Sequence, residues 1–429
     1  MLISQYRADG SNLLLAHEES LVPALQQESR QSQPYSPETN DWLFCQRLLN
    51  QFSSMALNGD LHLSKRCPTD WIYRFFYPEP TFWHAPSLSV PTGPYTRRIH
   101  KYIGGKKVSL HNLYAALKEA EQFLFEPPDE ILTETRRCII QESPPHPAFH
   151  PVVYDMRRIL SHIGDDVSVY LHGSMATGDY TPFSDVDDLV IVHQTGWSSY
   201  ARFREVVRRL ETVATLFQRI DPLQHHGHWI YLDSDMACLD QSSLPLVVLN
   251  DSVIVVGRPE VTANLRLEDW GLRRILWDNI QDVRHNASAM ARGKLNLYGL
   301  KNLVSGISLL PPLIFQINGK MLDKKTAILR SSNIFSDKAL VALQWSTKLR
   351  ETWASCHGYM GLRMMGYLNC ILPFRRNTLE AIARRCLPSL RTSQIPFLTD
   401  EVVKAIFQLS NECVNQLREV IVLNGVKGV

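Results

Sequence analysis

The chain has 429 residues, of which 45% are hydrophobic and 21% charged, the composition of a folded soluble protein with two or three units. Its 45 Lys and Arg residues are nearly balanced by 43 Asp and Glu residues, so the formal net charge is only +2. This balance argues against a protein that coats nucleic acid, and any contact with a polyanion must be local.

The cysteines and the apolar runs indicate the compartment. Eight cysteines are scattered singly without a Cys-x-x-Cys pair, which favours a reducing compartment and argues against a disulfide scaffold or a zinc ribbon. Residues 1–20 carry charges through their apolar part and lack the basic leader of a secretory signal. The longest apolar run, residues 303–317, is too short to cross a bilayer. We therefore expect a cytoplasmic protein without membrane contact.

Residues 1–147 predict a mostly helical or irregular region that ends in a proline-rich linker. Helices are expected at 41–57 and 109–125, where apolar side chains recur on one face. Between them lie an aromatic, proline-rich patch (71–95) and a basic run (97–107). The aromatic side chains could stack on bases or pack under an irregular layer. The basic run could face solvent or contact phosphate or RNA.

Residues 148–259 predict a small α/β domain, and residues 260–429 are almost wholly helical. The first of these is expected to run helix, strand, strand, helix, strand, strand, at 152–163, 167–172, 187–192, 198–220, 226–232 and 246–256. The second is expected to hold helices at 267–290, 295–316, 336–360, 377–386 and 399–423. The expected class is α+β: a small mixed-sheet domain between a mostly helical or irregular N-terminal region and a C-terminal helical bundle.

One constellation lies between the first two expected strands. The first strand runs into Gly173 and Ser174, and Asp185-Val186-Asp187 opens the next strand. A glycine at a strand end lets backbone approach a phosphate, and a serine hydroxyl can donate to its oxygens. Residues two apart on a strand share a face, so Asp185 and Asp187 should point together. Two such carboxylates repel unless a divalent cation lies between them, and Mg²⁺ prefers carboxylate oxygens.

Each half of this constellation has a plainer interpretation when it stands alone. A Gly-Ser pair is usually a turn, and an Asp-x-Asp triplet is usually a solvated loop. Together, at this spacing and with turn-forming residues between them, they favour a site that holds a nucleotide and a metal.

This segment, residues 171–192, resembles the nucleotidyltransferase superfamily related to DNA polymerase β, most closely its bacterial minimal and antibiotic-modifying types. The superfamily signature is a Gly-Ser pair after a hydrophobic residue, then an Asp-hydrophobic-Asp-hydrophobic strand. The resemblance implies that Gly173 and Ser174 hold the triphosphate and that Asp185 and Asp187 bind the metal. The sequence departs from the pattern at Asp188, where an apolar residue is usual. Its side chain should face away from Asp187 and therefore needs a partner.

A third carboxylate usually follows on the strand after the long helix in this superfamily, but the interior of 226–232 contains no acid. His226 and His228 are expected on one face of that strand, and Asp221 precedes it. An imidazole could take a proton from an acceptor hydroxyl or bind the metal. The candidates for the base are therefore His226, His228 and Asp221, and the alternative is a weakened transferase without a third acid.

Lysines of the helical part are candidates for contacts with phosphate. Residues 310–325 resemble a helix and turn in the helical part of some bacterial members, so that Lys320, Lys324 and Lys325 could reach a nucleotide or remain in a solvated turn. Lys294 and Lys301 on the preceding helices are comparable. Arg350 and His357 match the loose Arg…His spacing of helical ribonuclease domains, a spacing that is common by chance.

The sequence therefore predicts transfer of a nucleoside monophosphate from an NTP, ATP foremost, to an acceptor hydroxyl, with Mg²⁺ or Mn²⁺ as cofactor. The near-neutral charge favours a small molecule or a protein as acceptor, and the basic run leaves an RNA end open. Two alternatives remain: a non-catalytic nucleotide- or partner-binding protein on a degenerate transferase fold, and an oligonucleotide or cyclic-dinucleotide synthase.

Overall fold

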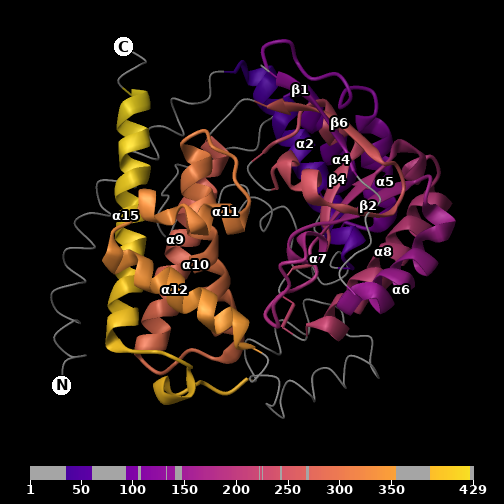
Figure 1. The fold of residues 1–429 in the computed structure, drawn as a ribbon. Helices are drawn as coiled ribbons and strands as arrows, with labels where there is room; N and C mark the ends of the chain where they lie inside the picture. Colours follow the sequence, from indigo (N-terminus) through magenta and orange to yellow (C-terminus); the bar gives the residue numbers. More distant parts are fainter. Residues whose placement is uncertain are drawn as a thin grey trace.

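The computed structural model describes residues 35–59, 93–104, 108–131, 133–140, 147–221, 223–224, 226–241, 244–266, 270–353 and 387–425. Most of the aromatic patch, the helix expected at 377–386 and His357 lie outside these residues. Figure 1 shows two parts side by side, the sheet with the N-terminal helices in indigo and magenta and the C-terminal helices in orange and yellow.

The centre of the first part is a four-stranded mixed sheet in the order β4-β3-β2-β5. Its strands are β2 (Val167–Leu171), β3 (Asp188–Val192), β4 (Trp229–Leu232) and β5 (Val253–Val256). Strand β2 pairs antiparallel with β3 and β5, whereas β3 pairs parallel with β4. The small mixed sheet expected from the sequence is confirmed.

Both faces of this sheet are buried, and the alternation of side chains along each strand explains how. On β3, Val190 and Val192 point to one core, while Leu189 and Ile191 point to the other. Strand β4 alternates in the same way, with Ile230 on the first face. Because both faces are covered, the strands read as continuous hydrophobic runs in the sequence.

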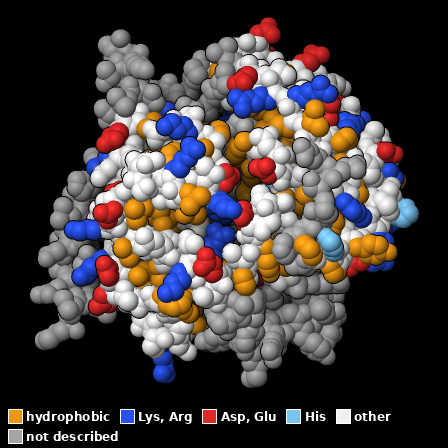
Figure 2. Space-filling view, in the orientation of Figure 1, with side chains coloured by type: hydrophobic (Ala, Val, Ile, Leu, Met, Phe, Trp, Pro, Cys, Tyr) orange, Lys and Arg blue, Asp and Glu red, His pale blue; other side chains and the backbone are white. Residues whose placement is uncertain are grey.

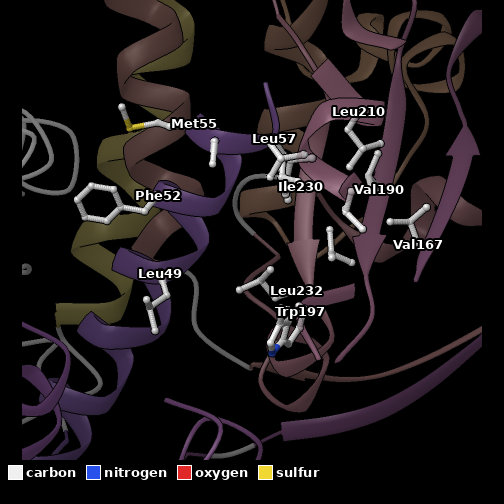
Figure 3. Close-up of a cluster of buried hydrophobic side chains, with 14 of the residues drawn as sticks. Leu49, Phe52, Met55, Leu57, Val167, Val190, Trp197, Leu210, Ile230 and Leu232 are labelled. Carbon is white, nitrogen blue, oxygen red and sulfur yellow. The ribbon is translucent and has the colours of Figure 1, made fainter. Parts of the chain in front are cut away.

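Helices cover the first face of the sheet. They are α2 (Pro37–Leu57), α4 (Pro94–Ile103), α5 (Leu110–Ala120), α6 (His150–Leu160) and α8 (Tyr200–Ile220). Figure 3 shows side chains of α2 and α8 in one cluster with those of β3 and β4. The amphipathic pattern that predicted α2, α5, α6 and α8 therefore reflects one shared core.

A two-stranded ribbon covers part of the opposite face, and the sequence did not predict it. Strand β1 (Thr133–Ile139) pairs antiparallel with β6 (Glu260–Arg266). Val261, Ala263 and Leu265 of β6 pack against the sheet, whereas β1 is almost wholly exposed. The polar sequence of β1 (TETRRCI) has no hydrophobic alternation to mark it, and it lies between the two proline clusters, 127–128 and 142–151, that were expected to form a linker.

Helix α2 occupies the place of a further strand at the edge formed by β4. The side chain of Asn50 donates to the carbonyl oxygen of Ile230 at 3.0 Å. The side chain of Asn58 accepts from the backbone N–H of His228 at 2.8 Å and donates to its carbonyl oxygen at 3.2 Å. These side-chain amides satisfy backbone groups that an edge strand would otherwise leave open. The N-terminal region is thus an integral part of the sheet domain.

The second part is a helical bundle with a core of its own. Its helices are α9 (Trp270–Ala291), α10 (Leu297–Ile317), α11 (Lys324–Leu329), α12 (Asp337–Glu351) and α15 (Asp400–Gly425). By length and composition α10 could cross a membrane, but 67% of that stretch is buried inside the protein. Phe183 and Leu223, both from the sheet domain, are buried in the bundle core. These two side chains anchor the bundle to the sheet domain.

Two expected strands differ from those observed. The strand expected at 226–232 begins only at Trp229, because residues 226–228 make side-chain contacts instead of a strand ladder. The strand expected at 246–256 is divided into a 3₁₀ turn (Leu246–Asp251) and the short β5. Apolar runs such as these do not by themselves distinguish a strand from a buried turn.

The contact between α2 and β4 can be tested by substitution. Asn58→Ala removes both hydrogen bonds to the backbone of His228, which is left unsatisfied, and a third to the carbonyl oxygen of Ser54. We therefore expect the free energy of unfolding to fall by about 1–3 kcal/mol. Urea unfolding measures this change. Gln51→Ala, on the same helix, is the matched control and should stay within about 0.5 kcal/mol of the parent protein. Equal values for the two variants would contradict the assigned role.

Candidate functional site

The Gly-Ser turn after β2 brings backbone close to a carboxylate. Gly173 has φ 66°, a conformation that other residues rarely adopt, and a Cβ at this position would lie 3.0 Å from Oδ2 of Asp187. Gly173 is exposed, and the half-buried Ser174 begins the four-residue helix α7 (Ser174–Thr177). Only glycine suits this position, because of the positive φ and because the nearby carboxylate leaves little room for a side chain.

Three side chains converge beside this turn. Asp185, Asp187 and His226 each offer a ligand atom, and these atoms all lie within 4.8 Å of one another. Nε2 of His226 is 3.0 Å from Oδ1 of Asp187 and 3.4 Å from Oδ2 of Asp185. The expectation that the two aspartates point together is confirmed, but both precede β3, which begins at Asp188, so they are not strand residues as the sequence predicted. The structure adds His226 to them.

Gln224 fixes the position of His226 relative to the aspartates. Its side-chain oxygen accepts from the N–H of Val186 at 3.1 Å, and its side-chain nitrogen donates to the carbonyl oxygen of Val186 at 2.9 Å. The same nitrogen lies 3.1 Å from the carbonyl oxygen of His226. One buried amide therefore joins the middle of the Asp-Val-Asp segment to the loop that carries the histidine.

The two carboxylates strongly favour a proton on His226. Burial lowers the pKa of this imidazole, but the hydrogen bonds to Asp185 and Asp187 outweigh burial and raise it to about 10. Burial and Asp185 both raise the pKa of Asp187, yet the contact with His226 brings it below its usual value. A positive charge between the two aspartates is therefore a requirement of the site, which a proton or a metal ion can meet.

His228 lies apart from this cluster, so the expectation that it shares a face with His226 is wrong. Its Nδ1 is 2.6 Å from Oδ2 of Asp188, and its Nε2 is 2.9 Å from the carbonyl oxygen of Leu210. Both ring nitrogens are engaged and the side chain is fully buried. Residues 226–228 are not in a strand, so the alternation assumed for them does not apply. The partner expected for Asp188 is confirmed and is His228.

Asp221 lies one layer behind the aspartate pair. One of its oxygens accepts from the N–H of Leu223 at 3.0 Å, and the other accepts from Nζ of Lys301. Lys301, fully buried on α10, is also 3.7 Å from Oδ2 of Asp185. Burial disfavours its charge, but Asp185 and Asp221 hold the pKa of Lys301 above its usual value. Asp221 thus positions a cation of the bundle against the aspartate pair and is outside the ligand cluster.

Two further cations face the aspartates from the bundle. Lys324, at the start of α11, is exposed and interacts electrostatically with Asp187, Asp185 and Arg350. Burial lowers the pKa of Arg350, whose guanidinium lies 5.3 Å from the ring centre of Phe183. Within the described ranges, neither Lys324 nor Arg350 forms an ion pair. Figure 2 shows Lys and Arg side chains beside Asp and Glu side chains near the middle of this face.

The other lysines named from the sequence lie differently. Lys320 is exposed, as Lys324 is, and lies in the turn after α10. Lys325 is also exposed and lies 2.5 Å from Asp179, in the loop after α7. Among the three lysines expected in this segment, Lys324 alone interacts electrostatically with the aspartate pair.

The ligand types present fit a divalent cation. Two carboxylates and one imidazole nitrogen at this separation can be shared by one ion, as hard oxygen ligands and a borderline nitrogen ligand. Asp185 and Asp187 retain 15% and 26% of their side-chain surface, so the cluster is open to solvent on one side.

Two residues of the site were not assigned to it from the sequence. Gln224 precedes His226 by two positions and carries no motif of its own, so nothing marked it in advance. Arg350 was noticed only as half of a ribonuclease-like pair, because its distance from Asp185 along the chain hides their proximity in space. A charged residue on the buried side of a helix such as α12 is the only available signal, and it is weak.

Comparison with known proteins agrees with this geometry. Residues 153–214 match the family model described as a nucleotidyltransferase domain. The match runs from α6 through α8 and includes Gly173, Ser174, Asp185 and Asp187. The resemblance to the DNA polymerase β-like superfamily is confirmed for this part of the chain. Comparisons with curated proteins and with solved structures gave no match.

The charge on His226 predicts a pH-dependent stability. Because the pKa of His226 is raised from an unfolded value of about 6.5 to about 10, the stabilisation is fully present below pH ~6.5 and is lost as the pH rises through about 10. His226→Asn removes this contribution. In chelator-treated protein, the difference in free energy of unfolding between the parent and this variant should shrink from pH 6 to pH 10. A difference that does not change with pH would contradict the ion pair.

Proposed function

We propose that this nucleotidyltransferase domain transfers a nucleoside monophosphate from an NTP, ATP foremost, to an acceptor hydroxyl with release of pyrophosphate. One observation carries the proposal: a pair of carboxylates lies opposite two cations, Lys324 and Arg350, that have no ion-pair partner in the described part of the chain. A bound triphosphate would supply the negative charge that these cations lack.

Each side of the site has its own task in this proposal. Asp185 and Asp187 would hold Mg²⁺ or Mn²⁺. When bound, that ion neutralises phosphate charge and lowers the pKa of a hydroxyl that it binds. The exposed backbone at Gly173 and the hydroxyl of Ser174 would contact phosphate oxygens. Lys324 and Arg350 would bind the outer phosphates and orient the donor for in-line attack.

The candidates for the base are narrowed by their partners. Both ring nitrogens of His228 are engaged, and Asp221 is paired with Lys301. Of the three, His226 is the one whose side chain contacts the aspartate pair.

The acceptor that we propose is a small molecule or a protein side chain. Arg98 and Lys101, in the basic run on α4, both form ion pairs with Glu119, at 2.9 Å and 3.3 Å. Paired cations attract phosphate less than unpaired ones, so Arg98 and Lys101 offer less to RNA than the sequence indicated. An RNA end is the second choice.

The main alternative is a nucleotide-binding protein without transferase activity. It is favoured by one observation: the third group at the aspartate pair is His226, where the superfamily usually has a carboxylate. A charged imidazole in this place can satisfy the carboxylates without metal. Separate assays of catalysis and of nucleotide binding therefore distinguish the two functions.

Removing the two carboxylates proposed to bind metal tests whether the protein is a transferase. Asp185→Asn combined with Asp187→Asn should lower the rate of pyrophosphate release by at least about 100-fold, because the charge that stabilises the transition state is lost. Each NTP is supplied with Mg²⁺ or Mn²⁺ and with a panel of acceptors. Product from NTPs alone would identify a synthase. NTP binding without any pyrophosphate release that depends on these aspartates would favour the non-catalytic alternative.

Removing the unpaired cations tests the donor subsite. Lys324→Met and Arg350→Met should each raise the Kd for NTP about 10-fold or more, the scale of one charge-assisted hydrogen bond. Lys320→Met is the matched control from the same segment, and its Kd should be unchanged. Calorimetry measures the three values, and circular dichroism confirms that each variant is folded. Equal effects at Lys320 and Lys324 would overturn the assignment.

A further inference from the structure

The ring of His226 is oriented by the backbone of the next residue, Gly227. Nδ1 lies 3.1 Å from the carbonyl oxygen of Gly227. The side-chain nitrogen of Gln224 is 3.3 Å from the same Nδ1, but its two hydrogens point to the carbonyl oxygens of Val186 and His226. Nδ1 therefore carries a hydrogen and donates it to Gly227. The other nitrogen, Nε2, is directed at Asp185 and Asp187.

The loop that carries His226 is held on both sides. Gln224 binds both backbone groups of Val186, which lies between the two aspartates. Asn58 binds both backbone groups of His228, two residues after the histidine. This arrangement places the imidazole before any ligand arrives. An Nδ1–H that donates to a backbone carbonyl is also how proteins commonly orient a metal-binding histidine.

We propose that Nε2 of His226 is the third ligand of the metal site, with Asp185 and Asp187, and that this ligand makes the site bind divalent transition-metal ions more tightly than Mg²⁺. The proposal rests on the proposed function for the presence of a metal at the aspartate pair. It adds the identity of the third ligand and the metal preference.

The preference follows from the chemistry of the ligand atoms. Mg²⁺ prefers oxygen ligands and gives up its waters reluctantly, whereas imidazole nitrogen suits transition metals. Mn²⁺ binds most weakly of the divalent first-row series, so a preference for Mn²⁺ over Mg²⁺ is the stringent case.

The charge of the site acts in the same direction. The imidazole releases its Nε2 proton to solvent when a metal binds. A neutral imidazole in place of a carboxylate then removes one negative charge from the ligand set. The ammonium of Lys301, 3.7 Å from Asp185, offsets part of what remains. Binding of Mg²⁺ depends on this negative charge more than binding of a nitrogen-preferring ion does. The aspartate pair with His226 is therefore a poorer Mg²⁺ site than three carboxylates would be.

The assignment also bears on proton transfer. A nitrogen that is bound to metal has no free electron pair, so His226 would not accept the proton of the acceptor hydroxyl. The acceptor would then lose its proton to solvent or to a group of its own.

Mn²⁺ binding followed by electron paramagnetic resonance tests the proposal. The full chain is titrated with Mn²⁺ and then with competing Mg²⁺, without nucleotide and again with a non-hydrolysable ATP analogue. We expect Mn²⁺ to bind at least about 10-fold more tightly than Mg²⁺, and pulsed spectra to show the ¹⁴N coupling of a bound imidazole. In His226→Asp, the coupling should vanish and the Mn²⁺ preference should fall about 10-fold.

Two further variants keep the result interpretable. His172 also acts on the charge of Asp187, and its Nε2 has no hydrogen-bond partner among the described residues. His172→Gln should keep the ¹⁴N coupling if the nitrogen belongs to His226. His226→Gln replaces His226→Asp if the latter fails to fold, and it should also lose the coupling.

The outcomes separate this proposal from the proposed function. Mn²⁺ bound without ¹⁴N coupling, with or without the analogue, overturns the assignment of His226, even if transferase activity is present. An unchanged Mn²⁺ preference in His226→Asp overturns the proposed selectivity. A nitrogen-coupled Mn²⁺ site in a protein that transfers no nucleotide supports the ligand and removes the proposed function.

Discussion

The repulsion between the carboxylates of Asp185 and Asp187 is the constraint that organises this protein. The two side chains are brought together by covalent spacing, and each makes ionisation of the other less favourable. Four basic side chains surround the pair. His226 contacts it, Lys301 lies behind it, and Lys324 and Arg350 face it from the bundle. The superfamily pattern in the sequence identifies the two carboxylates. The basic side chains around them are brought there by the tertiary structure.

The ion pairs around the aspartates also connect the sheet domain to the helical bundle. Lys301 lies on a bundle helix but pairs with Asp221 and approaches Asp185, both from the sheet domain. Phe183 and Leu223 enter the bundle core within two residues of Asp185 and Asp221. Apolar anchoring and ion pairing therefore act at the same place, so the position of the bundle and the electrostatics of the site are coupled. A change in how the bundle packs would therefore change the charges around the aspartates.

Side-chain amides have an unusual share in placing the site. Gln224 and Asn58 each bind the N–H and the carbonyl of one backbone residue, as a neighbouring strand would. Between them, residues 226–228 are free of the alternation of a strand, and two histidines separated by one glycine point to different partners. His226 contacts Asp187 of the aspartate pair, while His228 pairs with the buried Asp188. Of these two neighbouring histidines, one therefore lies at the aspartate pair and the other is buried in the core.

The sequence by itself determined the Gly-Ser turn, the aspartate pair and most of the fold around them. Gly173 and Asp187 could be placed because a strand, a turn and a second strand fix their geometry locally, and the hydrophobic periods located the main helices. The sequence did not determine β1, whose polar residues carry no periodic signal, or the different partners of His226 and His228. Only the tertiary structure decided which cations reach the aspartates, because Lys301, Lys324 and Arg350 come from helices more than a hundred residues further along the chain. Local geometry follows from short-range periodicity, whereas the choice of counter-charge depends on how distant helices pack.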